Sequence, residues 1–234
     1  MTPAPIAAVD LGRRDYDEVL TLQRDLCRRR VARETDRDLL LLVEHDPVIT
    51  LGRGTKATSL PIAVELLQSR GVAVREVERG GDVTIHEPGQ LVGYPIFDLA
   101  GWRQDLHWYL RALEGALIDG LGALGITAGR REKLTGVWVE DRKIASIGIH
   151  VKQWVTLHGF ALNVVNDLAL FDLVVPCGIH GVQMTTVARE LGLPAERGLF
   201  ERTRAAMVSA LGDTFERPIE PAPPAALDSG APLP

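Results

Sequence analysis

Apolar residues recur at helical spacing in several stretches of the chain, and each stretch predicts a helix. From Asp15 to about Arg33 they form one stripe at i, i+3 and i+4 spacing. The stripe consists of Tyr16, Val19, Leu20, Leu26 and Cys27. Because Cys27 lies among these core residues, we interpret it as a small buried hydrophobe rather than a reactive thiol. Residues 61–70, 104–124 and 199–211 are also predicted helices, and a short helix is expected after Thr186.

Short apolar runs bounded by glycine, proline and polar turns predict the strands. We expect strands at residues 39–43, 48–51, 72–77, 82–86, 91–99, 135–139, 143–150 and 156–164. The run 39–43 is too short to cross a membrane and is typical of a buried strand. The segments 135–139 and 143–150 flank the polar turn Glu140-Asp141-Arg142, which predicts a β-hairpin.

The order of these elements indicates the fold class. The strands occur in clusters and the helices do not alternate with them, which predicts an α+β fold with a mixed, mostly antiparallel β-sheet flanked by helices. We expect a single domain over residues 1–217. From Pro218 the composition shifts to proline, alanine and glycine, so residues 218–234 are predicted to be a disordered tail.

Composition and charge exclude several classes of protein. Of 234 residues, 46% are hydrophobic and 24% are charged, which is typical of a globular chain. The net charge of -5 argues against a general nucleic-acid binder. No apolar run approaches the roughly 18 residues of a membrane helix, and Met1–Pro5 does not resemble a secretory signal. With only two cysteines, we expect no disulfide framework and a cytoplasmic location.

One stretch, Arg79 to Gln90, combines three glycines and a proline with several polar side chains. Glycine leaves room for another group to come close to the backbone. Within the stretch, residues 82–86 alternate polar and apolar, as a strand does between a core and a cavity. A β-turn would explain the glycines alone, whereas an active-site wall also explains the polar residues.

Cys177 follows the apolar run Val174-Val175-Pro176 and precedes Gly178, a sequence suited to presenting a thiol at the end of a strand. A buried structural cysteine is the alternative. A nucleophilic thiolate needs a partner that takes its proton. The candidates are His86, His150, His158, His180 and Lys143. Histidine is the usual partner of a cysteine, although the small and apolar neighbours of Lys143 allow desolvation to lower its pKa.

Metal and phosphate sites have little support in the sequence. No Cys-x-x-Cys or His-x-x-x-His pair is present, so we expect no metal. The phosphate-binding loop of P-loop proteins is absent, and no Gly-x-Gly-x-x-Gly motif opens a helix after a strand.

Several blocks of sequence together resemble the bacterial lipoyl (octanoyl) transferases, in the superfamily of biotin and lipoate protein ligases. The blocks occur in the family's order and span roughly residues 44–186. They are Thr50–Arg53, Arg79–Gly81, Val83-Thr84, His86, Pro88–Pro95, Lys143–Gly148, His158–Val164 and Pro176–Ile179. Two positions depart from the family pattern. Glu87 stands where glycine is usual and Asp82 where glutamine is frequent, and Glu87 could alter the loop or the docking of a carrier protein.

The resemblance implies an enzyme that moves an octanoyl group from acyl carrier protein, where phosphopantetheine carries it, to a lysine of a lipoyl domain. The acceptors of this family are subunits of 2-oxo acid dehydrogenases and the glycine cleavage H protein. The family's catalytic pair falls on Cys177 and Lys143, and this overrides the preference for histidine. The family's acyl pocket falls on Arg79, Gly80, Gly81, Asp82, Val83, Thr84, Ile85, His86, Ser146, Ile147, Gly148, Gly159, Phe160 and Ala161.

A thioester donor makes this chemistry favourable without ATP or a metal. Attack by Cys177 exchanges one thioester for another, and transfer to an amine then forms a more stable amide. Two alternatives stay open. One is an ATP-dependent lipoate or biotin protein ligase of the same fold, and the other is a module that holds an acyl group without transferring it.

Overall fold

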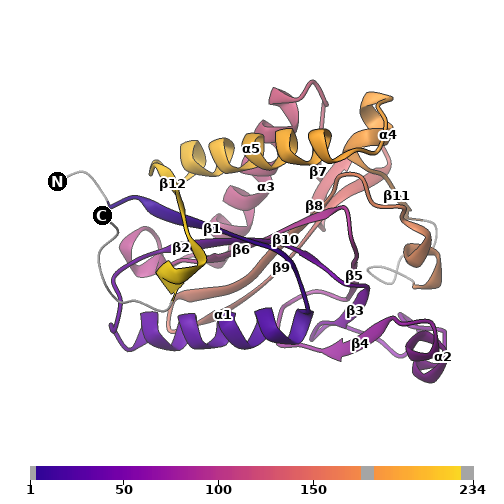
Figure 1. Ribbon diagram of the computed structural model, residues 1–234, viewed down its shortest axis with the longest axis horizontal. Coiled ribbons are helices and arrows are strands. Elements are labelled where there is room, and N and C mark those ends of the chain that lie inside the picture. The colour runs from indigo at the N-terminus through magenta and orange to yellow at the C-terminus, as the bar shows by residue number, and fades with distance from the viewer. Residues whose placement is uncertain (1–3, 175–181, 228–234) are drawn as a thin grey trace.

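A large β-sheet forms the centre of the molecule (Figure 1). The computed structural model describes residues 4–174 and 182–227. Within them the strands of this sheet are ordered β12-β1-β2-β6-β10-β9-β8-β7, and β11 pairs with β9. Their bounds are β1 Ile6–Arg14, β2 Leu39–His45, β6 Gln90–Ile96, β7 Gly129–Arg131, β8 Leu134–Val139, β9 Arg142–Lys152, β10 Val155–Asn163, β11 Gln183–Met184 and β12 Ile219–Ala222.

Strand directions confirm the predicted α+β fold with a mixed sheet. The run from β2 through β6, β10, β9 and β8 to β7 is antiparallel throughout. Parallel pairs join β1 to β2, β1 to β12 and β11 to β9. The predicted hairpin is β8 and β9. The strands β1, β7 and the two-residue β11 were not predicted, since none shows a clear alternation of apolar and polar residues.

Helices cover both faces of the large sheet (Figure 1). On one face lies α1, Tyr16–Val31, whose predicted stripe is buried and packs against β2, β6 and β10. Cys27 is 1% exposed within that core, as predicted. On the other face lie α3, Leu106–Ala123, and α5, Arg197–Thr214. The apolar stripe of α3 is buried from Leu113 onward, whereas Leu106 is 42% exposed because it begins the first turn.

A smaller sheet, ordered β4-β3-β5, lies beside one end of the large one. Its strands are β3 Val48–Leu51, β4 Ala73–Glu76 and β5 Val83–His86. Its core also takes in Leu67 of α2, Val64–Ser69, and Phe171 of the 3-10 helix η2, Ala169–Leu173. The helix predicted from Pro61 begins only at Val64. Another 3-10 turn, η1 at Leu99–Gly101, follows β6, and the short helix α4 occupies Val187–Leu191.

The prediction of a disordered tail is wrong for residues 219–227. Ile219–Ala222 forms β12, which pairs with β1, and Pro224–Leu227 forms the 3-10 helix η4. Leu227 is buried, and its carbonyl accepts a hydrogen bond of 2.6 Å from Arg29. Proline is compatible with an edge strand because its missing N–H group falls where no ladder bond is required. Residues 228–234 lie outside the described residues.

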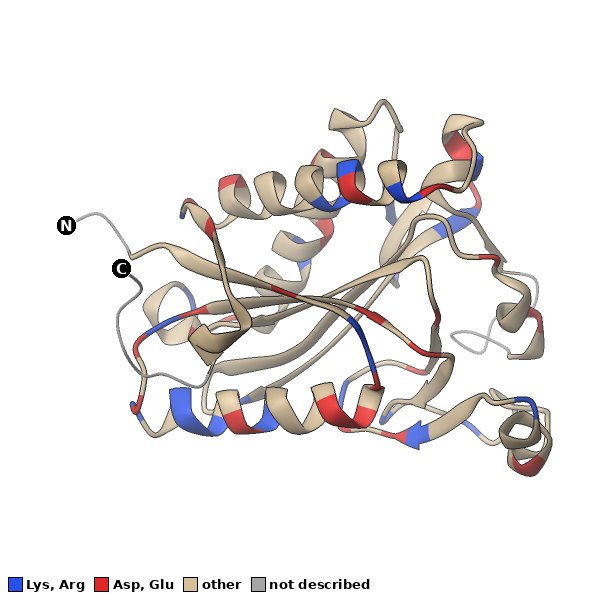
Figure 2. Cartoon of the chain, viewed as in Figure 1, with Lys and Arg blue, Asp and Glu red and all other residues tan. Residues whose placement is uncertain are grey.

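Charged residues of both signs are interspersed along the helices (Figure 2). On α1 the acidic residues Asp17 and Glu18 lie in the first turn and three arginines in the last turn. This arrangement complements the helix dipole at both ends. No helix in the described part of the chain is long and apolar enough to cross a membrane.

Candidate active site

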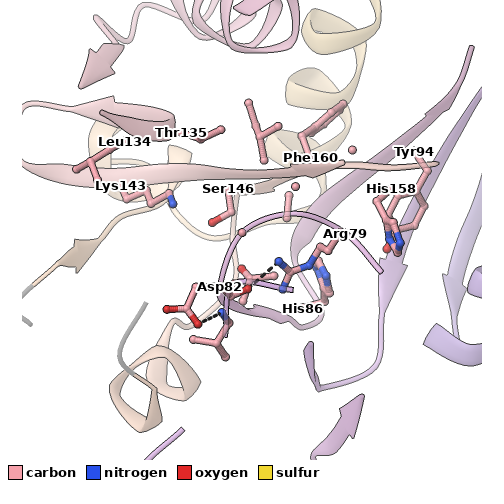
Figure 3. A pocket seen from close by; sticks show the side chains of 18 of the residues that line it. Arg79, Asp82, His86, Tyr94, Leu134, Thr135, Lys143, Ser146, His158 and Phe160 are labelled. Carbon is pink, nitrogen blue, oxygen red and sulfur yellow. Dashed lines mark hydrogen bonds between the residues drawn. The ribbon is translucent and has the colours of Figure 1, made fainter. Parts of the chain in front are cut away.

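A cavity of about 320 Å³ lies between the small sheet and strands β9 and β10 (Figure 3). Side chains from β5, from β8 to β10, and from the segment before β5 surround it. The lining residues are Tyr16, Gly54, Lys56, Arg79, Gly81, Asp82, Val83, Thr84, His86, Tyr94, Lys133, Leu134, Thr135, Lys143, Ser146, Ile147, Gly148, His158, Gly159, Phe160 and Ala161. In Figure 3, Leu134 and Lys143 lie at one end of the view and Tyr94 and His158 at the other.

Close backbone contact brings the two sheets together at this point. The N–H of Gly80 donates a hydrogen bond of 2.8 Å to the carbonyl of Ile149 in β9. A Cβ at Gly148 would lie 2.9 Å from Cδ of Arg79 and 3.0 Å from the carbonyl oxygen of Gly80. Glycine at position 148 is therefore required for the glycine-rich segment to pack against β9.

Arg79 fixes the shape of that segment. Its side chain is 6% exposed. One terminal nitrogen donates to the carbonyls of Gly80 and Asp82, at 3.1 and 2.7 Å. The other donates to the carbonyl and hydroxyl of Thr50, at 2.7 and 2.9 Å. The guanidinium thus ties residues 80–82 to β3 and shapes one wall of the cavity.

Asp82, one of the two departures from the family pattern, makes hydrogen bonds in the same wall of the cavity. Its carboxylate accepts from the Ser59 hydroxyl at 2.9 Å and from the Val83 N–H at 2.7 Å. The other departure, Glu87, is 6% exposed and accepts from Asn166 at 2.8 Å and from the Leu168 N–H at 3.3 Å. Burial raises the pKa of Glu87. These hydrogen bonds join Glu87 to the segment that follows β10.

Lys143 enters the cavity from β9. Lys143 is 4% exposed, and its backbone is paired with Trp138 of β8 and with Met184 of β11. The Lys143 carbonyl accepts from the Thr185 N–H at 3.0 Å. Its Nζ lies 5.6 Å from the centre of the Trp138 ring. In Figure 3 the amine is directed toward Ser146, which lies further along the same strand.

Apolar side chains make one side of the cavity. Phe160 on β10 is 2% exposed, and its ring occupies the space above Gly93 of β6, where a Cβ would overlap the ring. Ile147, which is paired with Phe160 in the β9–β10 ladder, and Ala161, which is paired with Ser146, also line the cavity. An aliphatic ligand would find its favourable contacts here.

Four buried rings from separate elements form a polar cluster beside this apolar surface. They are Tyr16, His45, His86 and Tyr94. Ring centres lie 5.2 Å apart for Tyr16 and His45, 5.7 Å for Tyr16 and His86, and 5.6 Å for His45 and His86. Burial lowers the pKa of His45 to about 4 and lowers the pKa of His86 well below its usual range. Both imidazoles are therefore neutral near pH 7.

Hydrogen bonds assign the tautomers of these two histidines. His45 Nδ1 lies 3.0 Å from the Arg14 carbonyl, so it carries the proton, and Nε2 accepts from the Tyr94 hydroxyl at 2.9 Å. Gln90 donates its amide protons to Ile85 and Asn163, which leaves its oxygen to accept from His86 Nδ1 at 2.9 Å. His86 Nε2 is consequently a hydrogen-bond acceptor.

His158 is held in an unusual backbone conformation beside this cluster. Its φ angle is 58°, a left-handed value that costs free energy in a residue other than glycine. Its backbone N–H donates to Gln23 at 2.9 Å, and Nε2 lies 3.7 Å from a carboxylate oxygen of Glu78. Burial lowers the pKa of His158. Strain kept at a buried cavity residue is a feature of functional sites.

The structure brings together all but two of the predicted acyl-pocket residues. Gly80 contacts β9 through its backbone, and Ile85 packs with Ile49 and Leu67 in the core of the small sheet, so neither lines the cavity. The other predicted acyl-pocket residues and Lys143 do line it. Cys177 and His180 lie outside the described residues. His150 is half-buried and is not among the lining residues.

Several lining residues were not predicted from the sequence. Tyr16 belongs to the apolar stripe of α1, and its helical spacing in that stripe predicts only that it is a core residue. Tyr94 lies within the block Pro88–Pro95 and could have been singled out there. Leu134 and Thr135 begin β8, and the exposed Lys56 and Lys133 lie in loops without a distinctive pattern.

Comparison with known proteins places the chain in a family. The family model described as the lipoyl protein ligase A/B catalytic domain matches residues 15–212. A protein named octanoyltransferase from Solibacter usitatus is 54% identical over 72% of this chain and 76% of its own length. Another of that name, from Synechococcus elongatus, is 46% identical over 91% of this chain and 88% of its own length.

Solved structures resemble this chain in fold. The bipartite lipoate protein ligase of Thermoplasma acidophilum aligns with a TM-score of 0.73 at 16% identity, covering 94% of this chain and 88% of its own. An apo biotin protein ligase from Aquifex aeolicus aligns with a TM-score of 0.50 at 10% identity, covering 92% and 70%. The fold is compatible with the sequence match, and the sequence match shows that this chain belongs to the family of the lipoyl protein ligase A/B catalytic domain.

Proposed function

We propose that this protein is an octanoyltransferase of protein lipoylation. The observation that carries the proposal is the buried amine of Lys143, which opens on a cavity with Ile147 and Phe160 on its apolar side. A base beside an aliphatic pocket suits transfer of a fatty acyl group. Relatives named octanoyltransferase, at 46–54% identity over most of the chain, support the same reaction.

The proposed mechanism proceeds through an acyl-enzyme on Cys177. Lys143 accepts the thiol proton, and the resulting thiolate attacks the carbonyl of the octanoyl thioester. The carbon–sulfur bond to phosphopantetheine breaks, and the departing thiolate takes up the proton. A lysine amine of the acceptor then attacks the acyl-enzyme, forming an amide as the bond to Cys177 breaks. Lys143 removes the proton that the new amide nitrogen loses.

The cavity contributes to binding through the acyl chain. Octanoate has about seven carbons beyond its carbonyl, at roughly 0.8 kcal/mol for each buried methylene. Complete burial would thus contribute on the order of 5 kcal/mol, partly offset by the ordering of the chain. The polar rings of Tyr16, His45, His86 and Tyr94 sit beside the apolar surface and limit how far a hydrocarbon chain extends.

Acyl carrier protein is the proposed donor, and lipoyl domains of 2-oxo acid dehydrogenases or the glycine cleavage H protein are the proposed acceptors. An acidic carrier would meet Lys56 and Lys133, which are exposed and line the cavity. The side chain of Lys133 is 87% exposed. The reaction as proposed needs neither ATP nor a metal, and a cytoplasmic location belongs to the same proposal.

Intact-protein mass spectrometry tests this function. The protein is mixed with octanoyl carrier protein without ATP, and wild type is compared with Cys177→Ala. We expect one octanoyl group to be added to wild type only and to be removed on addition of a lipoyl domain. Transfer by Cys177→Ala would remove the cysteine from its role. Labelling of a lipoyl domain only from free octanoate and ATP would establish a ligase instead.

A further inference from the structure

Gly136 of β8 lies against the side chain of Lys143. A Cβ at this position would lie 2.7 Å from Cε of the lysine, 3.4 Å from its Nζ and 2.6 Å from the carbonyl oxygen of Ala145. The φ angle of Gly136 is 129°, a value that side-chain-bearing residues rarely adopt. The space that the lysine stem occupies therefore exists because residue 136 has no side chain.

The pairing of β8 and β9 is irregular at the same point. Val137 is opposite Ala145, but the next residue, Trp138, is opposite Lys143. One step along β8 thus corresponds to two steps along β9, which is the signature of a β-bulge. Bulges re-aim a side chain and are frequent next to active sites. Here the bulge adjoins Lys143.

A buried carboxylate on α3 holds the backbone of this irregular segment. Glu114 is 1% exposed, and its Oε1 accepts a hydrogen bond of 3.1 Å from the N–H of Gly136. Its Oε2 accepts from Arg111 at 2.6 Å and from Arg130 at 3.0 Å. The side chains of the two arginines are 56% and 41% exposed, so water can also accept their hydrogen bonds. The Gly136 N–H is buried, and Glu114 is its partner.

We propose that Glu114 and Gly136 together position the Lys143 amine for proton transfer. The carboxylate fixes the peptide of Gly136, and the missing Cβ leaves the slot in which the lysine stem lies. Trp138, two residues further along β8, contacts the same amine from its ring. Glu114 is a positioning residue, because it acts on Lys143 through the backbone of β8. This inference rests on the proposed role of Lys143 as the base.

Substitutions of Gly136 and Glu114, which together form this positioning device, have distinct expected effects on the rate of acyl-enzyme formation. Gly136→Ala pushes the lysine stem out of its slot, so acyl-enzyme formation should fall toward the level of Lys143→Ala, on the order of 10²-fold. Glu114→Leu releases the Gly136 N–H and should lower the rate by about tenfold or more, because the amine is no longer held at one position. Glu114→Gln keeps an oxygen acceptor for that N–H and should restore most of the rate.

The test measures alkylation of Cys177 by iodoacetamide from pH 6 to 10, resolved from Cys27 by peptide mass, together with the rate of acyl-enzyme formation. The matched control is Gly129→Ala, on the neighbouring strand β7, where a Cβ meets open space. We expect wild-type profiles for the control, and for Glu114→Leu a profile displaced in the direction shown by Lys143→Ala. Circular dichroism verifies that each variant is folded.

The outcomes separate the two proposals. A changed profile for Lys143→Ala, with unchanged profiles for folded Glu114→Leu and Gly136→Ala, would overturn the positioning device and leave the proposed function intact. An unchanged profile for Lys143→Ala would remove Lys143 from the role of base and the positioning device with it, and the mass-spectrometric comparison with Cys177→Ala would still decide whether the protein transfers octanoate. If Gly136→Ala does not fold, the comparison of Glu114→Leu with Glu114→Gln decides, since equal profiles for the two contradict the device.

Discussion

The Tyr94 hydroxyl donates a buried hydrogen bond of 2.9 Å to Nε2 of His45, and this bond requires a neutral imidazole. His45 is fully buried, and its Nδ1–H is committed to the Arg14 carbonyl. The pair therefore connects β2 and β6 behind the cavity and fixes the rings that limit it. Protonation of His45 would place a second proton where the Tyr94 hydroxyl now points, which agrees with the lowered pKa of His45.

His45 makes the folded state sensitive to acid. Burial lowers its pKa from 6.5 to about 4, so the unfolded chain binds a proton first as the pH falls. The contribution of neutral His45 to the free energy of unfolding is fully present above the pKa of 6.5 in the unfolded chain. Up to about 3 kcal/mol of it is lost as the pH falls to 4. Urea unfolding at pH 7 and pH 5 should show a smaller loss for His45→Gln than for wild type. His107→Gln, at an exposed position of α3, should behave as wild type, and an equal loss in all three proteins would contradict the assignment.

Gly93 lies against the ring of Phe160, which lines the cavity. A methyl group there overlaps the Phe160 ring. Since overpacking typically costs about 1–3 kcal/mol, Gly93→Ala should lower the melting temperature and shift the ring into the cavity. We expect octanoyl transfer to fall more than butyryl transfer, measured with carriers of both chain lengths. Gly122→Ala, where a Cβ meets open space on α3, serves as the control. An unchanged ratio of the two rates would place Phe160 outside the acyl site.

Lys133 is expected to contribute to docking of the donor. Its charge is exposed at the cavity and only loosely paired with Glu132, at 3.6 Å. Lys133→Glu should raise KM for octanoyl carrier protein several-fold, as reversal of a rim charge acts mainly on association. The effect should shrink at high salt because exposed charges are screened. Lys152→Glu, at the far end of β9, is the matched control. The same rise for both variants would indicate an effect of net charge alone.

The segment after Pro218 should contribute to stability. Leu227 is 6% exposed and packs with the core between α1 and the sheet. Leu227→Ala should destabilise the protein by about 2 kcal/mol, at the lower limit of large-to-small core substitutions. Glu220→Ala, exposed on the adjacent β12, should change the unfolding free energy little. Equal unfolding curves for Leu227→Ala and wild type would restore the prediction of a disordered tail.

The local pattern of the sequence predicted the elements whose period is strong. The stripe from Tyr16 to Cys27 and the hairpin around Glu140 are examples, because a buried face imposes its spacing directly on the chain. The Pro-rich segment after Pro218 misled the same reasoning. The composition of a segment indicates only the conformational entropy that is lost when the segment becomes ordered. The contacts that order this one, the pairing of β12 with β1 and the burial of Leu227, involve residues about two hundred positions away in the sequence.

The features of the candidate site also divide into those that the sequence predicted and those that only the tertiary structure shows. By itself, the sequence determined the family, the candidate pair Lys143 and Cys177, and the glycine-rich wall, because these are contiguous blocks of particular residue types. Only the tertiary structure decided that Ile85 faces a core and that Tyr16, from another layer, meets His86. It also decided that Glu114 reaches Gly136. Such contacts depend on the crossing of helices and sheets in space, and no local period in the chain records them.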